Sequence, residues 1–511
     1  MTLDKPNILL IQADQVCAQA LTAYSKNAVA KTPNLEALAE DGVVFESAYC
    51  NNPICAPSRF SMLSGQHTSR IQAFDNGAEF PGDIPTIAHY LRAEGYQTCL
   101  SGKMHFVGAD QLHGYEERLT TDVYPSDHGW TPDWSKPEER IDWWYHNMDS
   151  VRESGPCERT NQIDFDDEVA FRAVRKVYDL GRSQDSRPFF LTVSFTNPHD
   201  PYACPKEHWD RYEDAEINMP EVGYLPDDVL DPHSRRLRDA YLQHPDAATE
   251  EQIRNARHAY YGQLSYIDDK IGQIRKALAD TGLDENTIIL FTSDHGDMLG
   301  EKGMWYKMSF FEQSIRVPFV VHYPARFAKR RISNHVSLVD MLPTLLDIAD
   351  SDSINTPAAP LDGDSLLPLL NGDKWPDDRC VIAEFFAEGS CGPCFMVRQG
   401  PYKYIYTEPD PPQLYNLETD PKELFDLAGL PDYHEVELSL HKAMQAHQNP
   451  EVIRQQVIAS QQRRKIVFTA NMCGTHTPWD YSPKQNSAAQ YMRNNLDLNE
   501  VESNARIKSR A

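Results

Sequence analysis

Polar side chains that could bind a metal or move protons follow four apolar runs of the sequence, at the point where each run ends. The runs cover 7–12, 96–100, 189–195 and 287–292, and the residues after them are Asp14 and Gln15, Lys103 and His105, Asn197, His199 and Asp200, and Asp294 and His295. In open α/β sheets, ligands bind at the carboxyl ends of the strands. A single aspartate after a strand is usually a turn or a helix cap, but four such strand ends together predict an active site.

Two of these residues predict a divalent-metal site. Asp14 and Asp294 offer hard carboxylate oxygens, which suit calcium or magnesium. His295 adds a nitrogen next to Asp294.

Cys55 begins the pentapeptide Cys-Ala-Pro-Ser-Arg, which ends at Arg59 and is followed by Leu-Ser-Gly. Pro57 suits the first turn of a helix, where its missing N–H costs nothing. Cys55 would then lie at a helix N-terminus, whose free N–H groups favour anions. The alternative is a buried structural cysteine beside a helix-starting proline.

These motifs resemble the type I, formylglycine-dependent sulfatase family. The pentapeptide is similar to the family signature C-x-P-x-R, 102–105 to G-K-x-H, and 294–300 to the metal-binding segment D-H/N-G-x-x-L-G. In that family the signature cysteine is oxidised to formylglycine, whose aldehyde hydrate attacks sulfur. The resemblance therefore implies a sulfate-ester hydrolase that needs a formylglycine-generating or equivalent maturation enzyme.

The resemblance also implies roles for individual residues. Lys103 would hold the sulfate and the formylglycine oxygen, and Arg59 would support the aldehyde hydrate. His105 would take a proton when the sulfated hydrate collapses, and His199 with Lys307 would protonate the leaving group. The implied metal ligands are Asp14, Gln15, Cys55, Asp294 and His295.

Calcium is the expected ion, with magnesium and manganese as alternatives. The commoner family pattern has an aspartate at the position of Gln15 and an asparagine at that of His295. This departure leaves open which ion is preferred and whether Gln15 binds it directly.

The departure is typical of the branch that contains choline sulfatases, phosphonate monoester hydrolases and some bacterial arylsulfatases. Segments 108–114, 127–134, 140–147 and 491–494 are similar to those of choline sulfatases. The resemblance therefore implies hydrolysis of choline O-sulfate to choline and sulfate. The alternative is an arylsulfatase or a phosphonate monoester hydrolase of the same superfamily.

A choline substrate would need aromatic faces and a carboxylate around its trimethylammonium group. The resemblance implies Trp130, His146 and Glu388 for this pocket and Asn76 for contact with the sulfate. Further candidate faces, which could equally be core residues, are Trp143, Trp144 and Tyr145.

The order of the expected elements predicts the fold. Strands alternate with helices over the first part of the chain, which predicts a mostly parallel α/β sheet flanked by helices. The resemblance implies an alkaline-phosphatase-like catalytic domain at 1–371. For 372–511 we expect a smaller α+β domain with an antiparallel sheet (380–386, 395–398 and 402–407), a helix over 435–447 and a polar tail from 469.

Composition excludes some classes of partner. Lys and Arg total 49 and Asp and Glu total 76, which gives a formal charge of −27. Such a surface repels nucleic acid and anionic membranes. We find neither a signal-peptide pattern nor an apolar stretch of membrane-spanning length, so we expect a cytoplasmic protein. The expected assembly is a homo-oligomer, either a dimer or a tetramer.

Cys391-Gly-Pro-Cys394 matches the thioredoxin active-site sequence and raises a different hypothesis, a redox-active binding protein. In thioredoxin the motif opens a helix early in a small domain. Here it lies between two predicted strands of a long chain, so a turn with two incidental thiols is the favoured interpretation. The ten cysteines are expected to be mostly reduced and buried.

Overall fold

A mostly parallel sheet forms the centre of the protein. The computed structural model describes residues 5–136, 146–212, 217–350, 357–376, 378–476, 478–492 and 497–507. The strand order is β11 (Arg330–Ser337), β2 (Val43–Tyr49), β10 (Phe319–His322), β8 (Thr287–Ser293), β1 (Asn7–Ala13), β6 (Phe189–Phe195), β3 (Gln97–Gly102) and β4 (Glu117–Arg118), with β9 (Arg316–Val317) paired to β2. Of these described strands, only β9 and β10 run antiparallel to their neighbours.

The middle of this sheet fixes where the polar residues meet. β1 pairs in parallel with β6 and β8, and Ala13 is in register with both Phe195 and Ser293. Asp14 and Asp294 follow directly, so both leave the sheet at the same edge. All three strands are almost fully buried, as parallel strands covered on both faces should be.

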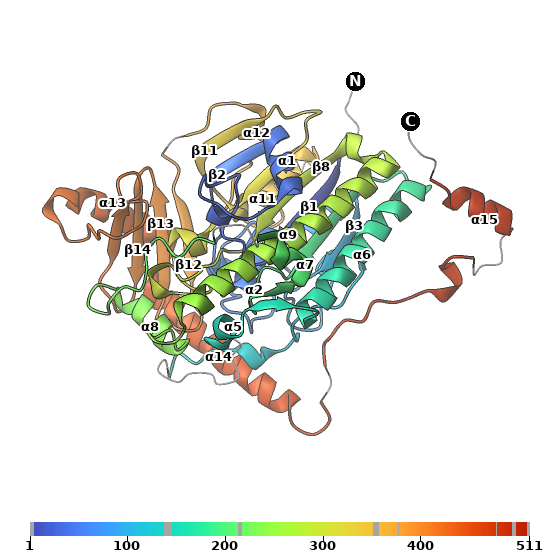
Figure 1. Cartoon of the computed structure of the whole chain (residues 1–511). Helices are drawn as coiled ribbons and strands as arrows, with labels where there is room; N and C mark the ends of the chain where they lie inside the picture. Colours follow the sequence, from blue (N-terminus) through green and yellow to red (C-terminus); the bar gives the residue numbers. More distant parts are fainter. Residues whose placement is uncertain are drawn as a thin grey trace.

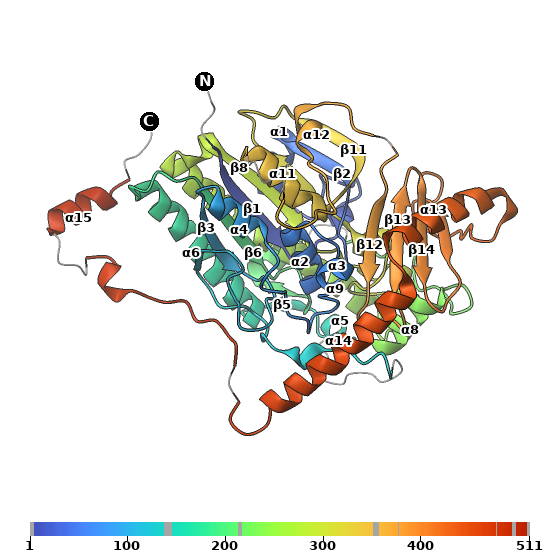
Figure 2. The ribbon, with the colours of Figure 1, turned by 180° about the vertical axis from the view of Figure 1, so that it is seen from behind.

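Helices cover both faces of the sheet. α6 (Asn161–Arg182) and α9 (Glu250–Thr281) lie in front of it in Figure 1. Seen from behind, α2 (Cys55–Ser64), α4 (Ile87–Ala93) and α11 (Met341–Ile348) lie in front of it (Figure 2). This is the layered α/β architecture that the sequence predicted.

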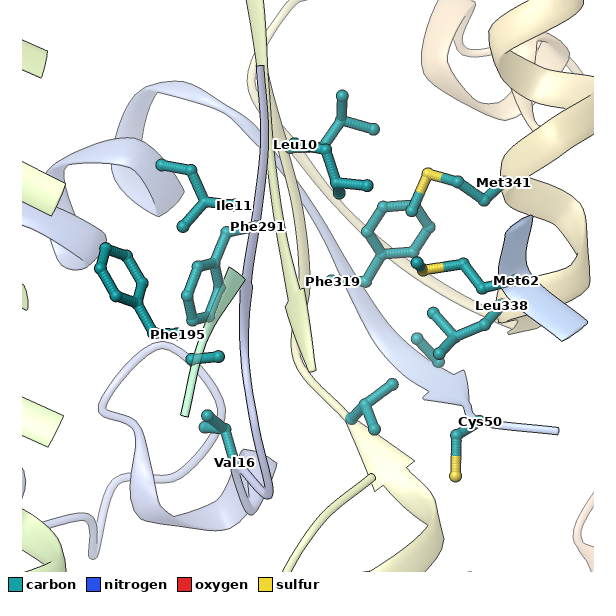
Figure 3. Packing of buried hydrophobic residues seen from close by; sticks show 14 of the residues in the cluster. Leu10, Ile11, Val16, Cys50, Met62, Phe195, Phe291, Phe319, Leu338 and Met341 are labelled. Carbon is teal, nitrogen blue, oxygen red and sulfur yellow. The ribbon is translucent and has the colours of Figure 1, made fainter. Parts of the chain in front are cut away.

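Figure 3 shows how neighbouring residues of β1 fill separate cores. Ile11 packs beside Phe195 and Phe291 on one side of the sheet, whereas Leu10 faces Phe319 and Met341 on the other. Successive strand residues point to opposite faces, so one fully apolar strand supplies both layers. This double burial holds the strand ends, and the polar residues after them, in place.

An antiparallel sheet follows in the chain, as predicted. It has the order β12 (Val381–Phe385), β13 (Cys394–Gln399), β14 (Tyr402–Thr407) and β15 (Gln413–Asn416), and α13 (His434–His447) packs on it. Its core also takes in Phe74 and Trp134 from the first part of the chain. The domain boundary near Gly372 stays a prediction.

One long helix, α14 (Pro450–Asn471), was not predicted from the sequence. Its start carries a recognisable signal, because Asn449 accepts hydrogen bonds from the backbone N–H groups of Glu451 and Val452 and Pro450 opens the helix. An extended segment and α15 (Leu498–Ala505) come after it (Figure 1).

The remaining elements are short and connect the larger ones. They are α1 (Pro33–Asp41), α3 (Thr68–Ile71), α5 (Asp149–Arg152), α7 (Lys206–Trp209), α8 (Pro232–Ala240), α10 (Glu312–Ile315), α12 (Leu367–Asn371), β5 (Gly155–Cys157) and β7 (Ala203–Pro205). In the described parts of the chain, we find no helix with both the length and the apolar composition needed to cross a lipid bilayer.

Candidate active site

Helix α2 positions Cys55 at the edge of the sheet. The helix begins at Cys55, as predicted, and the backbone N–H of Ala56 donates to Asn76 Oδ1 at 3.0 Å. Arg59 follows four residues later and so projects from the same side of the helix. The Cys55 side chain is buried, and burial raises the pKa of its thiol to about 11.

The Arg59 side chain forms hydrogen bonds with residues at the ends of several strands. Its Nε donates to Asp294 Oδ2 at 2.8 Å and its Nη2 to Asp14 Oδ2 at 3.0 Å. Its Nη1 donates to the Lys103 carbonyl and to Ser194 Oγ, both at 2.8 Å. All three guanidinium nitrogens are therefore engaged by the protein, so Arg59 fixes the geometry of both carboxylates.

Four donor atoms converge in front of these carboxylates. They belong to Asp14, Cys55, Asp294 and His295, and they all lie within 4.8 Å of one another. His295 Nδ1 lies 3.0 Å from the Gly296 carbonyl and must carry the proton to bond it, which leaves Nε2 as a lone-pair donor. Nε2 faces Cys55 Sγ at 3.2 Å. Two carboxylates, an imidazole and residue 55 fit a divalent cation.

Gln15 lies beside this cluster but its side chain has other partners. Its Oε1 accepts from Lys307 Nζ at 2.5 Å, and its Nε2 donates to Asp297 Oδ2 at 2.7 Å. Its backbone N–H donates to Asp294 Oδ1 at 3.1 Å. Direct metal binding by Gln15 stays a prediction.

Lys103 and His105 line the neighbouring part of the site. Lys103 Nζ pairs with Asp14 and lies 4.3 Å from the centre of the Tyr124 ring. Burial opposes the charged form of Lys103, but Asp14, Cys55 and Asp294 together outweigh it and the pKa is raised. Burial and the Lys103 charge lower the pKa of His105 to about 3, and neither His105 nitrogen has a hydrogen-bond partner among the described residues. His105 is therefore an unprotonated base.

His199 and Lys307 form a contact pair on the opposite side. Lys307 Nζ lies 2.6 Å from His199 Nε2, and His199 Nδ1 lies 2.7 Å from the Asp200 carbonyl. Because a carbonyl only accepts, Nδ1 carries the proton and Nε2 accepts from Lys307. Burial and the Lys307 charge lower the pKa of His199 well below its usual range. Lys307 is therefore the donor of this pair.

One small cavity connects the predicted catalytic and substrate residues. The described residues that line it are Cys55, Asn76, His105, Tyr124, Trp130, His146, His199 and Lys307. Its volume is about 10 Å³, about the room of one water molecule.

Glu388 is not among the residues that line this cavity, but it is buried and charged groups of the site act on it. Both of its carboxylate oxygens lack a hydrogen-bond partner among the described residues. Burial raises its pKa well above the usual value and Asp75 adds to this, whereas its own backbone N–H and Lys307 oppose it. The candidate faces Trp143, Trp144 and Tyr145 lie outside the described residues.

Several contacts at the site were not expected. Tyr124 packs 5.1 Å from Trp130 between ring centres, and nothing in its sequence context marks it. Arg464 of α14 donates to both carboxylate oxygens of Asp75 at 2.6 and 2.7 Å and to Thr131 Oγ1 at 3.0 Å. It thereby fixes the positions of Asp75 and Thr131, which are next to Asn76 and Trp130 in the sequence.

Cys391 lies in the connection between β12 and β13 and Cys394 is the first residue of β13, so the motif forms a turn between two strands, as the favoured interpretation predicted. All ten cysteines fall within the described residues and are free thiols. Burial raises the pKa of Cys394 to about 12, so it holds almost no thiolate at neutral pH.

Profiles of known protein families match most of the chain. The profile described as Sulfatase matches residues 6–351. The profile described as N-sulphoglucosamine sulphohydrolase, C-terminal, matches 300–450, and the one described as Choline sulfatase enzyme C terminal matches 455–507.

Individual relatives agree with this assignment. The chain is 46% identical to "Choline-sulfatase" of Rhizobium meliloti over 512 residues, which cover 99% of each chain. It is 30% identical to "Arylsulfatase" of Clostridium perfringens over 453 residues, covering 84% of this chain and 92% of that one. The crystal structure of a phosphonate monoester hydrolase of Agrobacterium radiobacter superimposes with a TM-score of 0.67 at 24% identity, covering 88% of this chain and 96% of that one. The fold class predicted from the sequence is confirmed.

Proposed function

The chain belongs to the sulfatase family and is a sulfuric ester hydrolase, and we propose that its substrate is choline O-sulfate, which it cleaves to choline and sulfate. The observation that carries the proposal is the cavity in which Cys55 meets Trp130 and His146. The nucleophile position and the candidate cation pocket then share one space. The relative from Rhizobium meliloti that is named Choline-sulfatase, which is 46% identical over 99% of each chain, supports the same substrate.

We propose that residue 55, Asp14, Asp294 and His295 hold one divalent cation, with calcium as the expected ion. When present, the ion would add positive charge at the nucleophile, and the family's formylglycine at residue 55 would supply an aldehyde hydrate in place of the thiol. Lys103 and Lys307 bring further positive charge to a monoanionic sulfate ester. Arg59 holds Asp14 and Asp294 in register with residue 55.

Lys307 and His199 would act on the leaving group. Choline leaves as a basic alkoxide and needs a proton in the transition state, which general acids supply. The Lys307 ammonium carries that proton and bonds His199 Nε2 at 2.6 Å. His199 would either position Lys307 or relay its proton to the substrate oxygen.

His105 would act as the base in the step that releases sulfate. Both of its nitrogens are buried without a hydrogen-bond partner among the described residues. Its lowered pKa keeps it unprotonated, so it can accept a proton from the second oxygen at residue 55. We propose that Asn76 contacts the sulfate through its Nδ2 group. Its Oδ1 already accepts from the Ala56 N–H at the helix start, and sulfate oxygens need donors.

Trp130, His146 and Glu388 would bind the trimethylammonium group. A cation–π contact is worth about 0.5–2 kcal/mol. Glu388 would supply the counter-charge, because its carboxylate has no hydrogen-bond partner among the described residues. An arylsulfatase or phosphonate monoester hydrolase would share the catalytic residues but would have no use for this carboxylate.

The decisive experiment compares two substrates on Glu388→Gln. We expect kcat/KM for choline sulfate to fall by roughly 5- to 150-fold, from a loss of about 1–3 kcal/mol. The value for p-nitrophenyl sulfate, whose leaving group carries no cation, should change little. Glu435→Gln, at an exposed position of α13, serves as control. A parallel fall for both substrates would remove Glu388 from the cation pocket.

A separate measurement tests the chemistry at residue 55. Mass spectrometry of its tryptic peptide should give the mass of formylglycine in active enzyme, and an unmodified cysteine there would refute the proposed nucleophile. The maturation enzyme, the dimer or tetramer and the cytoplasmic location stay predictions.

A further inference from the structure

A second cluster of metal-ligating side chains lies at the far end of α2 from Cys55. It consists of His67 just before α3, Glu384 in β12 and His447 at the end of α13. One donor atom from each lies within 4.8 Å of the others. The ten residues of α2 span about 15 Å, which separates this cluster from the nucleophile.

The carboxylate of this cluster is held in a fixed orientation. Glu384 Oε2 accepts from the backbone N–H of Ser69 at 2.7 Å, and Oε1 accepts from Ser69 Oγ at 2.6 Å. His447 Nε2 lies 2.7 Å from the same Oε1. Such outer contacts are what orients ligands in metal sites.

One histidine of the cluster has an unused donor atom. His67 is only 7% exposed, and its Nδ1 has no hydrogen-bond partner among the described residues. Its ring meets that of His447 edge-on, with 4.5 Å between ring centres. A buried polar atom without a partner is costly, so it points to a ligand that would complete it.

We propose that His67, Glu384 and His447 bind a divalent transition-metal ion of the zinc class. Two imidazole nitrogens and one carboxylate suit zinc rather than calcium, which prefers oxygen ligands. In a tetrahedral site the donors of His447 and Glu384 would stand roughly 3.3 Å apart, so they need to separate by a fraction of an ångström. His447 Nε2 would give up its proton to solvent when the ion binds.

The ion would join parts of the chain that are distant in sequence. His67 follows the helix that carries Cys55, whereas Glu384 and His447 belong to the antiparallel sheet and its covering helix. Glu388 comes four residues after Glu384 in the same segment. Metal binding would therefore stabilise the attachment of that segment to the catalytic sheet, independently of which sulfate ester is cleaved.

Zinc uptake by the full-length protein tests the proposal. Chelator-treated protein is dialysed against zinc with excess calcium present, and bound zinc per chain is measured by elemental analysis. We expect wild type to bind one equivalent more than either His67→Asn or His447→Asn. The control His434→Asn, at an exposed position on α13, should bind as wild type does. Equal uptake by wild type and both cluster variants would overturn the proposal.

Two further measurements keep the proposal testable if a variant folds poorly. Zinc should raise the melting temperature of wild type and of His434→Asn but not that of His67→Asn. Crystals of wild type grown with zinc should show anomalous scattering between His67 and His447 at the zinc edge. A difference map without a peak there would reject the site even if every variant failed to fold.

Discussion

The two sides of the candidate active site are built in opposite ways. The nucleophile side consists of Asp14, Cys55, Arg59, Asp294 and His295, and it comes from the ends of β1 and β8 and the start of α2. Arg59 bonds both of its carboxylates directly. The cation side consists of Trp130, His146 and Glu388, and it comes from connecting segments. The carboxylate of Glu388 has no hydrogen-bond partner among the described residues.

This difference shows which part is organised before substrate arrives. A buried charged group whose hydrogen bonds and ion pairs are all made within the protein is already oriented. Substrate binding then adds little to the stability of that group. A buried carboxylate without a partner is costly, typically by about 1–3 kcal/mol, until a ligand neutralises it. Changes on the nucleophile side should therefore affect every sulfate ester, and changes on the cation side only those with a cationic leaving group.

The largest effect should come from Cys55→Ser. In a host without serine-converting maturation, serine cannot become the aldehyde, so kcat/KM should fall at least about 10³-fold for choline sulfate and for p-nitrophenyl sulfate alike. Cys473→Ser, at an exposed position, is the matched control and should remain active. Substantial turnover by the Cys55→Ser variant, with the serine at residue 55 shown to be unmodified, would refute the mechanism.

His199→Ala should come next and should separate the substrates. General acid assistance is worth about 10²–10⁴-fold and matters most for a basic leaving group. Choline sulfate turnover should therefore fall steeply, whereas p-nitrophenyl sulfate, with its acidic phenol, should lose much less. If kcat falls equally for both, His199 serves the binding or the folding of the site rather than the leaving group.

Arg59→Lys should have a smaller effect that is equal for both substrates. Lysine keeps the charge but lacks the rigid planar fork whose separate nitrogens reach Asp14 and Asp294. Misplaced ligand carboxylates typically cost about 10- to 100-fold in metal affinity or activity. Calorimetric titration with calcium and kcat/KM on both substrates should show parallel losses. A variant that loses only choline sulfate turnover would contradict the division between the two sides.

The nucleophile side could be predicted from the sequence because secondary structure determines it. Each of its residues follows a strand or lies in the first turns of a helix, so finding β1, β8 and α2 fixed the residues that meet. The apolar runs that predict these strands are almost fully buried in the structure.

The contacts around the proposed cation side could be predicted only in part. Trp130 and His146 lie in connecting segments whose path depends on tertiary contacts, and no periodicity marks Tyr124 beside them. The clamp from Arg464 to Asp75 joins residues 389 positions apart. Sequence spacing carries no information about such a contact, and the missed helix α14 hid it.

The smallest effect, a change with pH, isolates Glu388. Burial raises the pKa of this carboxyl well above its usual 4.5, so it is protonated at low pH and ionises as the pH rises. Only the ionised form can neutralise the choline cation. The kcat/KM for choline sulfate should therefore depend on the ionisation of Glu388. The kcat/KM for p-nitrophenyl sulfate should not.

The ratio of the two kcat/KM values cancels the ionisations that both substrates share, since kcat/KM reports groups of the free enzyme. In wild type this ratio, choline sulfate over p-nitrophenyl sulfate, should increase as the pH rises from about 4.5 through the raised pKa of Glu388. In Glu388→Gln, which cannot ionise, it should stay flat. A wild-type ratio that is constant or falls with pH would mean that Glu388 does not pair with the cation. The cation side would then rest on Trp130 and His146 alone.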